Sequence, residues 1–216
     1  MLLYQLTVNR FRNIDRIEMD VHPRFTILHG DNAQGKTNLL EAIHLLGSLK
    51  SFRGARNDDL IRKGDEQATI SGRCRQQNQV ERQLQLDIRR DGKTVRLDNK
   101  GVSRPSDYLS CLRSIIFAPE EVGLVKGGPQ GRRRLIDRAV FMTRPSYLND
   151  LQEYERLLKQ RNRLLKNSGT PAELLPWTEA LARSGATIRK ERGIYLQAIA
   201  DGLTQCHHRI SQQREA

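Results

Sequence analysis

The sequence lacks long hydrophobic runs and has few cysteines. No stretch approaches the roughly 18 to 20 uninterrupted apolar residues of a membrane-spanning helix. The N-terminus also lacks the basic segment and apolar run of a secretion signal. Three widely spaced cysteines, Cys74, Cys111 and Cys206, predict neither a disulfide framework nor a zinc site. These absences argue against membrane and secreted proteins and predict a protein of the reducing cytosol.

Acidic residues are too few to balance the basic ones. Against 37 Lys and Arg there are only 25 Asp and Glu, which gives a net charge of +12 over 216 residues. The segment 126–166 alone has eleven basic and four acidic residues. Such a concentration is typical of a surface that binds a polyanion, but also of a solvated helix face. Charge alone leaves both interpretations open.

Hydrophobic periodicity indicates a β-rich first part. Alternation of apolar and polar residues predicts a hairpin over residues 2–21 and an antiparallel meander over 68–102, with a turn at Asn99–Gly101. Two short apolar runs, Phe25–Leu28 and Ile115–Phe117, predict strands buried on both faces.

Helical periodicity follows the first of these runs and returns after residue 131. It predicts a helix from Lys36 to about Ser48 and further helices over about 132–142, 147–166 and 177–199. Residues Cys206–His208 are predicted to belong to a polar tail, because adjacent histidines cannot share a helix face as metal ligands do. The sequence therefore predicts an α/β lobe over 1–125 and a helical lobe over 126–216.

One motif carries clear chemistry. Residues 30–37 match G-x-x-x-x-G-K-[ST] at every fixed position, between a predicted strand and a predicted helix. The residues of this phosphate-binding loop, or P-loop, are Gly30, Asp31, Asn32, Ala33, Gln34, Gly35, Lys36 and Thr37.

Each part of the P-loop suits a nucleotide phosphate. The two glycines permit positive φ, so that successive backbone N–H groups can point at phosphate oxygens. The helix that follows adds its unpaired N–H groups and the positive end of its dipole. Lys36 would neutralise the β- and γ-phosphates, and the Thr37 hydroxyl would be a Mg²⁺ ligand. The motif therefore predicts binding of ATP with Mg²⁺.

Hydrolysis needs more than this loop. It requires a carboxylate for Mg²⁺, usually at the end of a second buried strand, and a group that positions water. No apolar run followed by a pair of acidic residues occurs after residue 118. ATP hydrolysis by this chain alone is therefore not predicted.

Several motifs together resemble one family. They lie in order along the chain, at Leu6–Asn13, Gly30–Ile43, Phe117–Gly127, Arg132–Asp137 and Tyr154–Leu165. In this combination they resemble the RecF family of bacterial recombination and replication-repair proteins. The P-loop followed by Glu41-Ala42-Ile43 is similar to the wider group of ABC-type and SMC-like ATPase heads.

The resemblance implies an ABC-type P-loop head: a mixed or antiparallel β lobe with the P-loop, followed by a helical lobe. It implies an ATP-dependent homodimer that binds junctions of single- and double-stranded DNA and helps the mediators RecO and RecR to load a recombinase at gaps. The family's signature sequence and Walker B carboxylates are absent from these 216 residues. The chain is therefore expected to be the N-terminal portion of such a protein.

The resemblance also points to weaker candidates, each with a plain structural alternative. Arg12 and Asn13 resemble nucleotide contacts, although a hairpin turn also accounts for Asn13. Glu120 lies where a loop couples the lobes of such heads, and it equally suits a helix start. Candidate DNA contacts are Lys126, Arg132, Arg133 and Arg134, which suit a solvated face as well.

Three functions remain as hypotheses. The first is a nucleotide-gated, DNA-binding ATPase head. The second is a P-loop kinase or nucleotide transferase, although the meander over 68–102 differs from the alternating β/α pattern of such enzymes. The third is a nonenzymatic basic DNA-binding fragment in which the P-loop has no function.

Overall fold

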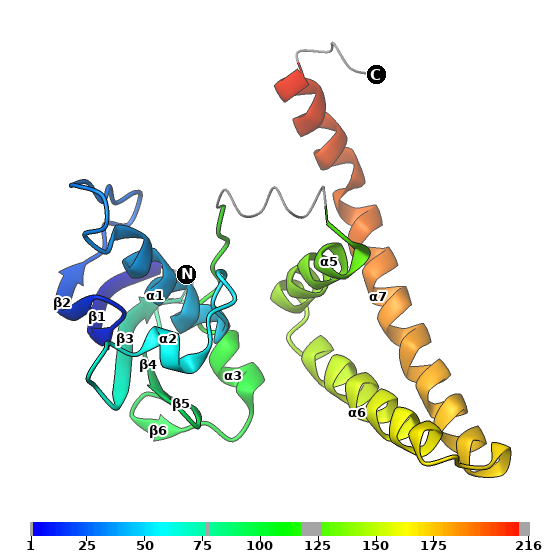
Figure 1. The fold of residues 1–216 in the computed structure, drawn as a ribbon. Coiled ribbons are helices and arrows are strands. Elements are labelled where there is room, and N and C mark those ends of the chain that lie inside the picture. Colours follow the sequence, from blue (N-terminus) through cyan, green and yellow to red (C-terminus); the bar gives the residue numbers. More distant parts are fainter. Residues whose placement is uncertain (1, 77, 118–126, 212–216) are drawn as a thin grey trace. The chain divides into compact units, whose positions relative to one another are not determined.

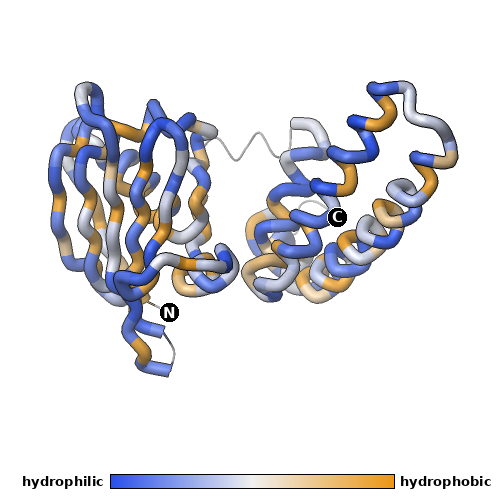
Figure 2. Tube along the Cα trace, turned by 90° about the horizontal axis from the view of Figure 1, so that it is seen from below, coloured by the Kyte–Doolittle hydropathy of each residue, from blue (hydrophilic) through white to orange (hydrophobic). Residues whose placement is uncertain are grey.

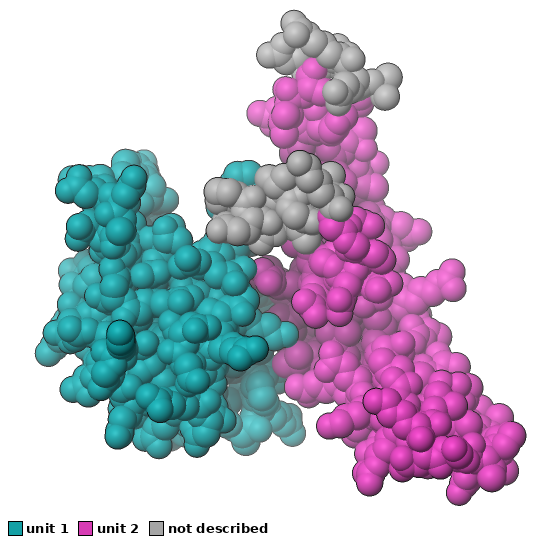
Figure 3. All heavy atoms as spheres, viewed as in Figure 1, with its two compact units in different colours: residues 1–121 teal, residues 122–216 magenta. Residues whose placement is uncertain are grey.

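The computed structural model describes residues 2–76, 78–117 and 127–211. The chain divides into two compact units, residues 1–121 and 122–216, which Figure 3 colours separately. The predicted boundary near residue 126 lies in the stretch between the described parts, so its position stays a prediction.

Unit 1 is built on a six-stranded antiparallel sheet with the order β2-β1-β3-β4-β5-β6 (Figure 1). The strands are β1 (Leu2–Phe11), β2 (Ile14–Asp20), β3 (Gln67–Arg75), β4 (Glu81–Arg89), β5 (Gly92–Leu97) and β6 (Lys100–Gly101). The helices in the described part of this unit are α1 (Lys36–Ser48), α2 (Asn57–Leu60) and α3 (Pro105–Leu109). The predicted hairpin, meander and helix after the P-loop are thereby confirmed.

Helix α1 packs on the sheet and closes the core. It contacts β1, β3 and β4, and its buried residues Ala42, Leu45 and Leu46 belong to the same hydrophobic cluster as the inward-facing residues of those strands. Figure 2 shows hydrophobic and hydrophilic positions alternating along the strands, as a sheet with one covered face requires. This packing holds the N-terminus of α1, and with it the P-loop, at a defined place on unit 1.

Two predicted strands are not formed. Residues 25–28 and 115–117 pair with no strand among the described residues. Most of their apolar side chains are exposed, with Ile27 at 74% and Phe117 at 98%, whereas Leu28 and Ile116 are half-buried. The prediction of buried strands at these positions was wrong for this structure. An apolar run indicates a preference for burial, but burial of a strand on both faces needs neighbouring strands, which the antiparallel sheet does not supply here.

Two smaller predictions also need correction. The turn between β5 and β6 is made by Asp98 and Asn99, both at positive φ, one residue before the predicted position. Two successive residues at positive φ are what a tight hairpin turn requires. The predicted polar tail at Cys206–His208 is instead the continuation of a long helix that ends at Ser211.

In its described part, unit 2 consists of α5 (Pro129–Thr143), α6 (Tyr147–Lys166) and α7 (Pro171–Ser211). Val140, Tyr147 and Ile188, one from each helix, are buried together. The Tyr147 hydroxyl donates to Asp137 at 2.7 Å, and Arg192 donates to both oxygens of Asp137 at 2.7 and 2.9 Å. The predicted helical lobe is confirmed, and none of its described helices is apolar over a length that could cross a bilayer.

Candidate functional site

The P-loop residues lead into α1 through several positions with positive φ. Gly30 and Gly35 have φ of 136° and 99°, and Ala33 between them has φ of 64°. Gly35 is the N-cap of α1, where no side chain caps the helix and no acidic residue lies in its first turn. The first N–H groups of α1 are therefore available to an anion, as the sequence predicts.

The Lys36 ammonium lies against the loop itself. Its Nζ donates to the carbonyl oxygens of Gly30 and Asp31, at 2.7 and 2.6 Å. These are neutral acceptors, and a phosphate oxygen accepts a stronger, charge-assisted hydrogen bond from the same ammonium. The side chain is thus held within the loop, close to where the P-loop motif places a phosphate.

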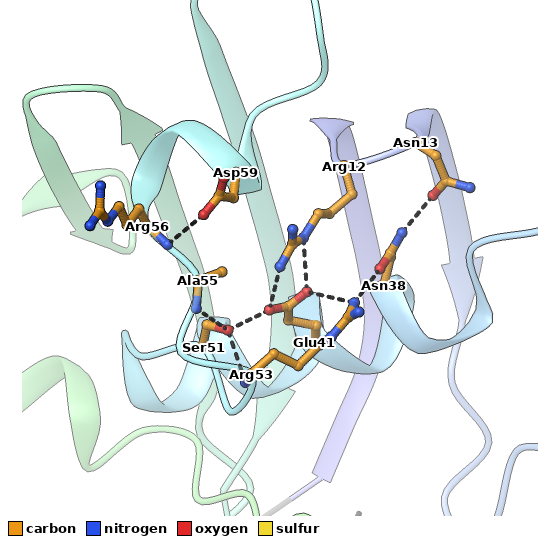
Figure 4. A network of polar contacts seen from close by, with 9 residues as sticks. All are labelled: Arg12, Asn13, Asn38, Glu41, Ser51, Arg53, Ala55, Arg56 and Asp59. Atoms are coloured by element: carbon orange, nitrogen blue, oxygen red, sulfur yellow. Dashed lines mark hydrogen bonds and ion pairs between the residues drawn. The ribbon is translucent and has the colours of Figure 1, made fainter. Parts of the chain in front are cut away.

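Asn13 supports the P-loop from the β1–β2 turn. Its Nδ2 donates to the carbonyl of Ala33 at 3.1 Å. Its Oδ1 accepts from Asn38 Nδ2 of α1 at 2.8 Å, a contact drawn in Figure 4. A methyl group on Gly35 would lie 2.9 Å from Asn13 Oδ1. The close approach explains in physical terms why a glycine occupies position 35.

Arg12 is fixed beside the same loop by a carboxylate that the sequence analysis did not single out. Its Nε and Nη2 donate to the two oxygens of Glu41 at 3.0 and 3.1 Å. Glu41 lies on α1 and is completely buried. Ser51 also donates to Glu41, and Arg53 Nη1 lies 3.9 Å from it. Figure 4 shows these side chains converging on Glu41.

A cavity of about 1020 Å³ opens at this place. The P-loop contributes Asn32, Ala33, Gly35, Lys36 and Thr37 to its lining, whereas Gly30, Asp31 and Gln34 do not line it. Arg12, Asn13, Asn38 and Arg53 line it too, and the remaining wall comes from residues 58, 59 and 61–65 and from Arg90. Six basic residues and three acidic ones face the cavity, so its lining suits an anion the size of a nucleoside triphosphate.

The residues present fit Mg²⁺–ATP in part. The loop offers N–H groups, an ammonium and open backbone to the phosphates, and Thr37 lies on the cavity wall where a hydroxyl ligand for Mg²⁺ is expected. In the described part of the chain, no group of three or more His, Cys, Asp and Glu side chains is placed so that it could hold a metal ion by itself. A bound Mg²⁺ would thus share its coordination with phosphate oxygens.

The other predicted residues are Glu120 and the candidate DNA contacts. Glu120 and Lys126 lie outside the described residues. Arg132, Arg133 and Arg134 are exposed in the first turns of α5 in unit 2, where Arg132 Nη1 donates to the carbonyl of Gly127 at 2.9 Å. Their role as DNA contacts stays a prediction.

Sequence reasoning missed Glu41, Ser51 and Arg53. A signal existed for Glu41, because it lies among the apolar residues of the α1 stripe, and a carboxylate there must find a partner. Ser51 and Arg53 lie in an irregular segment, where no periodicity indicates which side chains turn inward.

Comparison with known proteins assigns the fold to a family. Residues 2–173 match the model of the RecF/RecN/SMC N-terminal domain. The chain is 40% identical over all 216 residues to a protein of Syntrophotalea carbinolica named DNA replication and repair protein RecF, and covers 59% of it. A protein of Geobacter sulfurreducens with the same name is 41% identical over 98% of this chain, which covers 57% of that protein.

Solved structures agree with this assignment. A structure described as the recombination mediator protein RecF-ATP in the RecFOR pathway matches 98% of this chain with a TM-score of 0.92 and 30% identity. The Smc head domain of Pyrococcus furiosus shares the fold alone, with a TM-score of 0.51 and 19% identity. This chain spans a little under three fifths of the RecF proteins it matches, 58% of the RecF-ATP chain. The chain thus belongs to the RecF/RecN/SMC family, in which proteins named RecF resemble it over its whole length.

Proposed function

We propose that this chain binds ATP with Mg²⁺ and is the nucleotide-binding head of a DNA-binding repair protein. The observation that carries the proposal is the cationic cavity of about 1020 Å³ with Gly35, Lys36 and Thr37 on its wall. In this arrangement the N-terminus of α1 and the Lys36 ammonium bind phosphates, and Thr37 ligates Mg²⁺. The match to a solved RecF described with ATP supports the same ligand.

The test is titration with a fluorescent ATP analogue. Lys36→Ala removes one charge-assisted contact and should weaken binding about tenfold or more. Lys50→Ala is the matched control, because it removes the same charge from a residue outside the cavity lining. Equal affinities for the wild type and Lys36→Ala would refute the proposed site.

The DNA-related part of the proposal rests on charge and on the relatives. An exposed cationic group on α5 consists of Arg132, Arg133 and Arg134. The relatives of this chain are named as DNA replication and repair proteins. The proposed activity is ATP-gated binding of junctions between single- and double-stranded DNA by a homodimer. RecO and RecR are the proposed partners in loading a recombinase at gaps, in line with a structural relative described within the RecFOR pathway.

The competing functions make different predictions. The antiparallel sheet of unit 1 differs from the alternating β/α order typical of P-loop kinases, which disfavours a small-molecule kinase. A DNA-binding fragment without nucleotide control would bind DNA equally with and without ATP. ATP-stimulated DNA binding that is lost in Lys36→Ala supports the proposed head and excludes this third hypothesis.

A further inference from the structure

Glu41 connects three separate pieces of unit 1 around the cavity. Arg12 comes from the β1–β2 turn, Glu41 from α1, and Ser51 and Arg53 from the segment after α1. Arg12 and Arg53 line the cavity, whereas Glu41 does not. Glu41 is thus placed to act on a ligand only through the side chains that it holds.

A buried carboxylate needs a hydrogen-bonded or charged partner, and Glu41 has one that is held in a single orientation. Both carboxylate oxygens accept from Arg12, so the plane and direction of that guanidinium are fixed. Within the described residues Arg12 uses only Nε and Nη2 for this pair, which leaves Nη1 for a ligand in the cavity. A bidentate pair of this kind determines orientation as well as energy.

Glu41 also holds the segment that carries Arg53. Ser51 donates its hydroxyl hydrogen to Glu41, and its oxygen accepts from the backbone N–H groups of Arg53 and Ala55, at 3.1 and 3.3 Å. Ser51 therefore transmits the position of the Glu41 carboxylate to the backbone of residues 53–55, as Figure 4 shows.

The network continues to the P-loop. Arg53 Nη1 donates to Asn38 Oδ1 at 3.2 Å, Asn38 donates to Asn13, and Asn13 donates to the carbonyl of Ala33. One side of the cavity wall is therefore a continuous set of polar contacts that starts at a buried carboxylate and ends on the phosphate-binding backbone.

We propose that Glu41 is a positioning residue of the nucleotide site, which orients Arg12 and Arg53 toward the phosphates of the bound nucleotide. The inference rests on the proposed ATP binding and adds a residue that does not touch the nucleotide. Without the carboxylate, Arg12 loses both of its fixed contacts and the Ser51–Ala55 segment loses its anchor.

Charge and position predict opposite effects for the Glu41→Gln variant. The substitution removes one negative charge next to the cavity, so a purely electrostatic role for Glu41 predicts tighter binding of ATP. A positioning role predicts weaker binding, because a guanidinium that is no longer directed at the phosphates loses a charge-assisted hydrogen bond. The sign of the change therefore separates the two roles.

The experiment measures the affinity of a fluorescent ATP analogue for the wild type, Glu41→Gln and the control Glu18→Gln. Glu18 is an exposed carboxylate on β2, paired with Arg16 at 3.6 Å, and lies outside the cavity lining. Glu41→Gln should weaken binding about tenfold or more, the effect of one charge-assisted contact. The double variant Arg12→Gln/Glu41→Gln should bind the ATP analogue no less tightly than whichever single variant has the lower affinity, because both changes remove the same contact.

Thermal unfolding monitored by circular dichroism shows whether each variant is folded. Should Glu41→Gln not fold, Ser51→Ala replaces it, because that change removes the link to the loop without leaving Arg12 unpaired. It should weaken binding several-fold and increase tryptic cleavage after Arg53. Unchanged or tighter ATP binding in a folded Glu41→Gln, or in Ser51→Ala when it is the replacement, would overturn the positioning role. Loss of binding in Lys36→Ala would at the same time uphold the proposed function, so the two failures are distinguishable.

Discussion

The close packing of the P-loop against Asn13 can be tested by adding a single methyl group at Gly35. This residue is the N-cap of α1 with φ of 99°, and a Cβ there would lie 2.9 Å from Asn13 Oδ1 and 3.3 Å from Asn13 Nδ2. Gly35→Ala therefore introduces a strained backbone and a contact with the side chain that supports Ala33. Both effects act where the phosphate is expected to bind.

The structure allows the size of the effect to be estimated. An alanine held at positive φ costs about 1–2 kcal/mol. Displacement of Asn13 breaks its hydrogen bonds to Ala33 and Asn38, at about 1 kcal/mol each. The free energy of unfolding of unit 1 should thus fall by about 3 kcal/mol, which lowers the Tm by roughly 12–24 °C for a domain of about 100 residues.

Two alanine variants divide this loss into its parts. Gly30 has a positive φ of 136°, and a methyl group added there would meet no atom within 4 Å, so Gly30→Ala should show the backbone strain alone. Gly92, in β5, has neither feature, so Gly92→Ala should leave the Tm almost unchanged. Calorimetry and ATP-analogue titration of the three variants complete the assay. A Gly35→Ala protein as stable as Gly30→Ala, with wild-type nucleotide affinity, would refute the role given to the contact with Asn13.

Three further predictions concern other parts of the chain. Cys206 is exposed and should react quickly with a thiol reagent at pH 8. Burial raises the pKa of Cys74 to about 12, so Cys74 should react only after denaturation. A time course of the reaction in native and in denaturing buffer tests both expectations. Asp137→Asn leaves the Arg192 guanidinium without its bidentate carboxylate and should lower the free energy of unfolding of unit 2 by about 2–3 kcal/mol. Urea titration measures this loss, and an unchanged unfolding midpoint would contradict the role given to the ion pair. Replacing Arg132, Arg133 and Arg134 by Gln should make the slope of log K for DNA against log salt less steep by about 2–3, and an unaltered slope would remove them as phosphate contacts.

Register within the sheet shows what periodicity cannot provide. Simple alternation from Leu2 to Val8 predicts that Leu2, Tyr4, Leu6 and Val8 share one face. In the structure the pairing of β1 with β3 shifts between Leu3 and Gln5, and Leu3 is buried together with Leu6 and Val8. An extra residue at a bulge exchanges the two faces, and only the partner strand determines where it lies.

The exposed apolar runs show the same limit. Phe25–Leu28 has the composition of a buried strand, yet Phe25 is 68% exposed, because no described strand lies beside it. Composition specifies a tendency toward burial, and the neighbours that satisfy it are a property of the tertiary structure.

The P-loop was evident from the sequence because its chemistry is local. Glycines at positions 30 and 35 followed by Lys36 and Thr37 match a phosphate-binding motif within consecutive residues, and this motif needs only the start of a helix to complete it. The helical periodicity after residue 131 was equally local, and it predicted the helices of unit 2 before their packing was known.

The wall of the site was decided by tertiary structure alone. Arg12 and Glu41 are 29 residues apart, and Ser51 and Arg53 lie in a segment without periodicity, so no pattern in the sequence joins them. They meet because α1 packs on the sheet with Glu41 facing inward, where a buried carboxylate has to be paired. The sequence by itself therefore predicted a phosphate-binding loop at residues 30–37, and packing determined which distant side chains surround that loop.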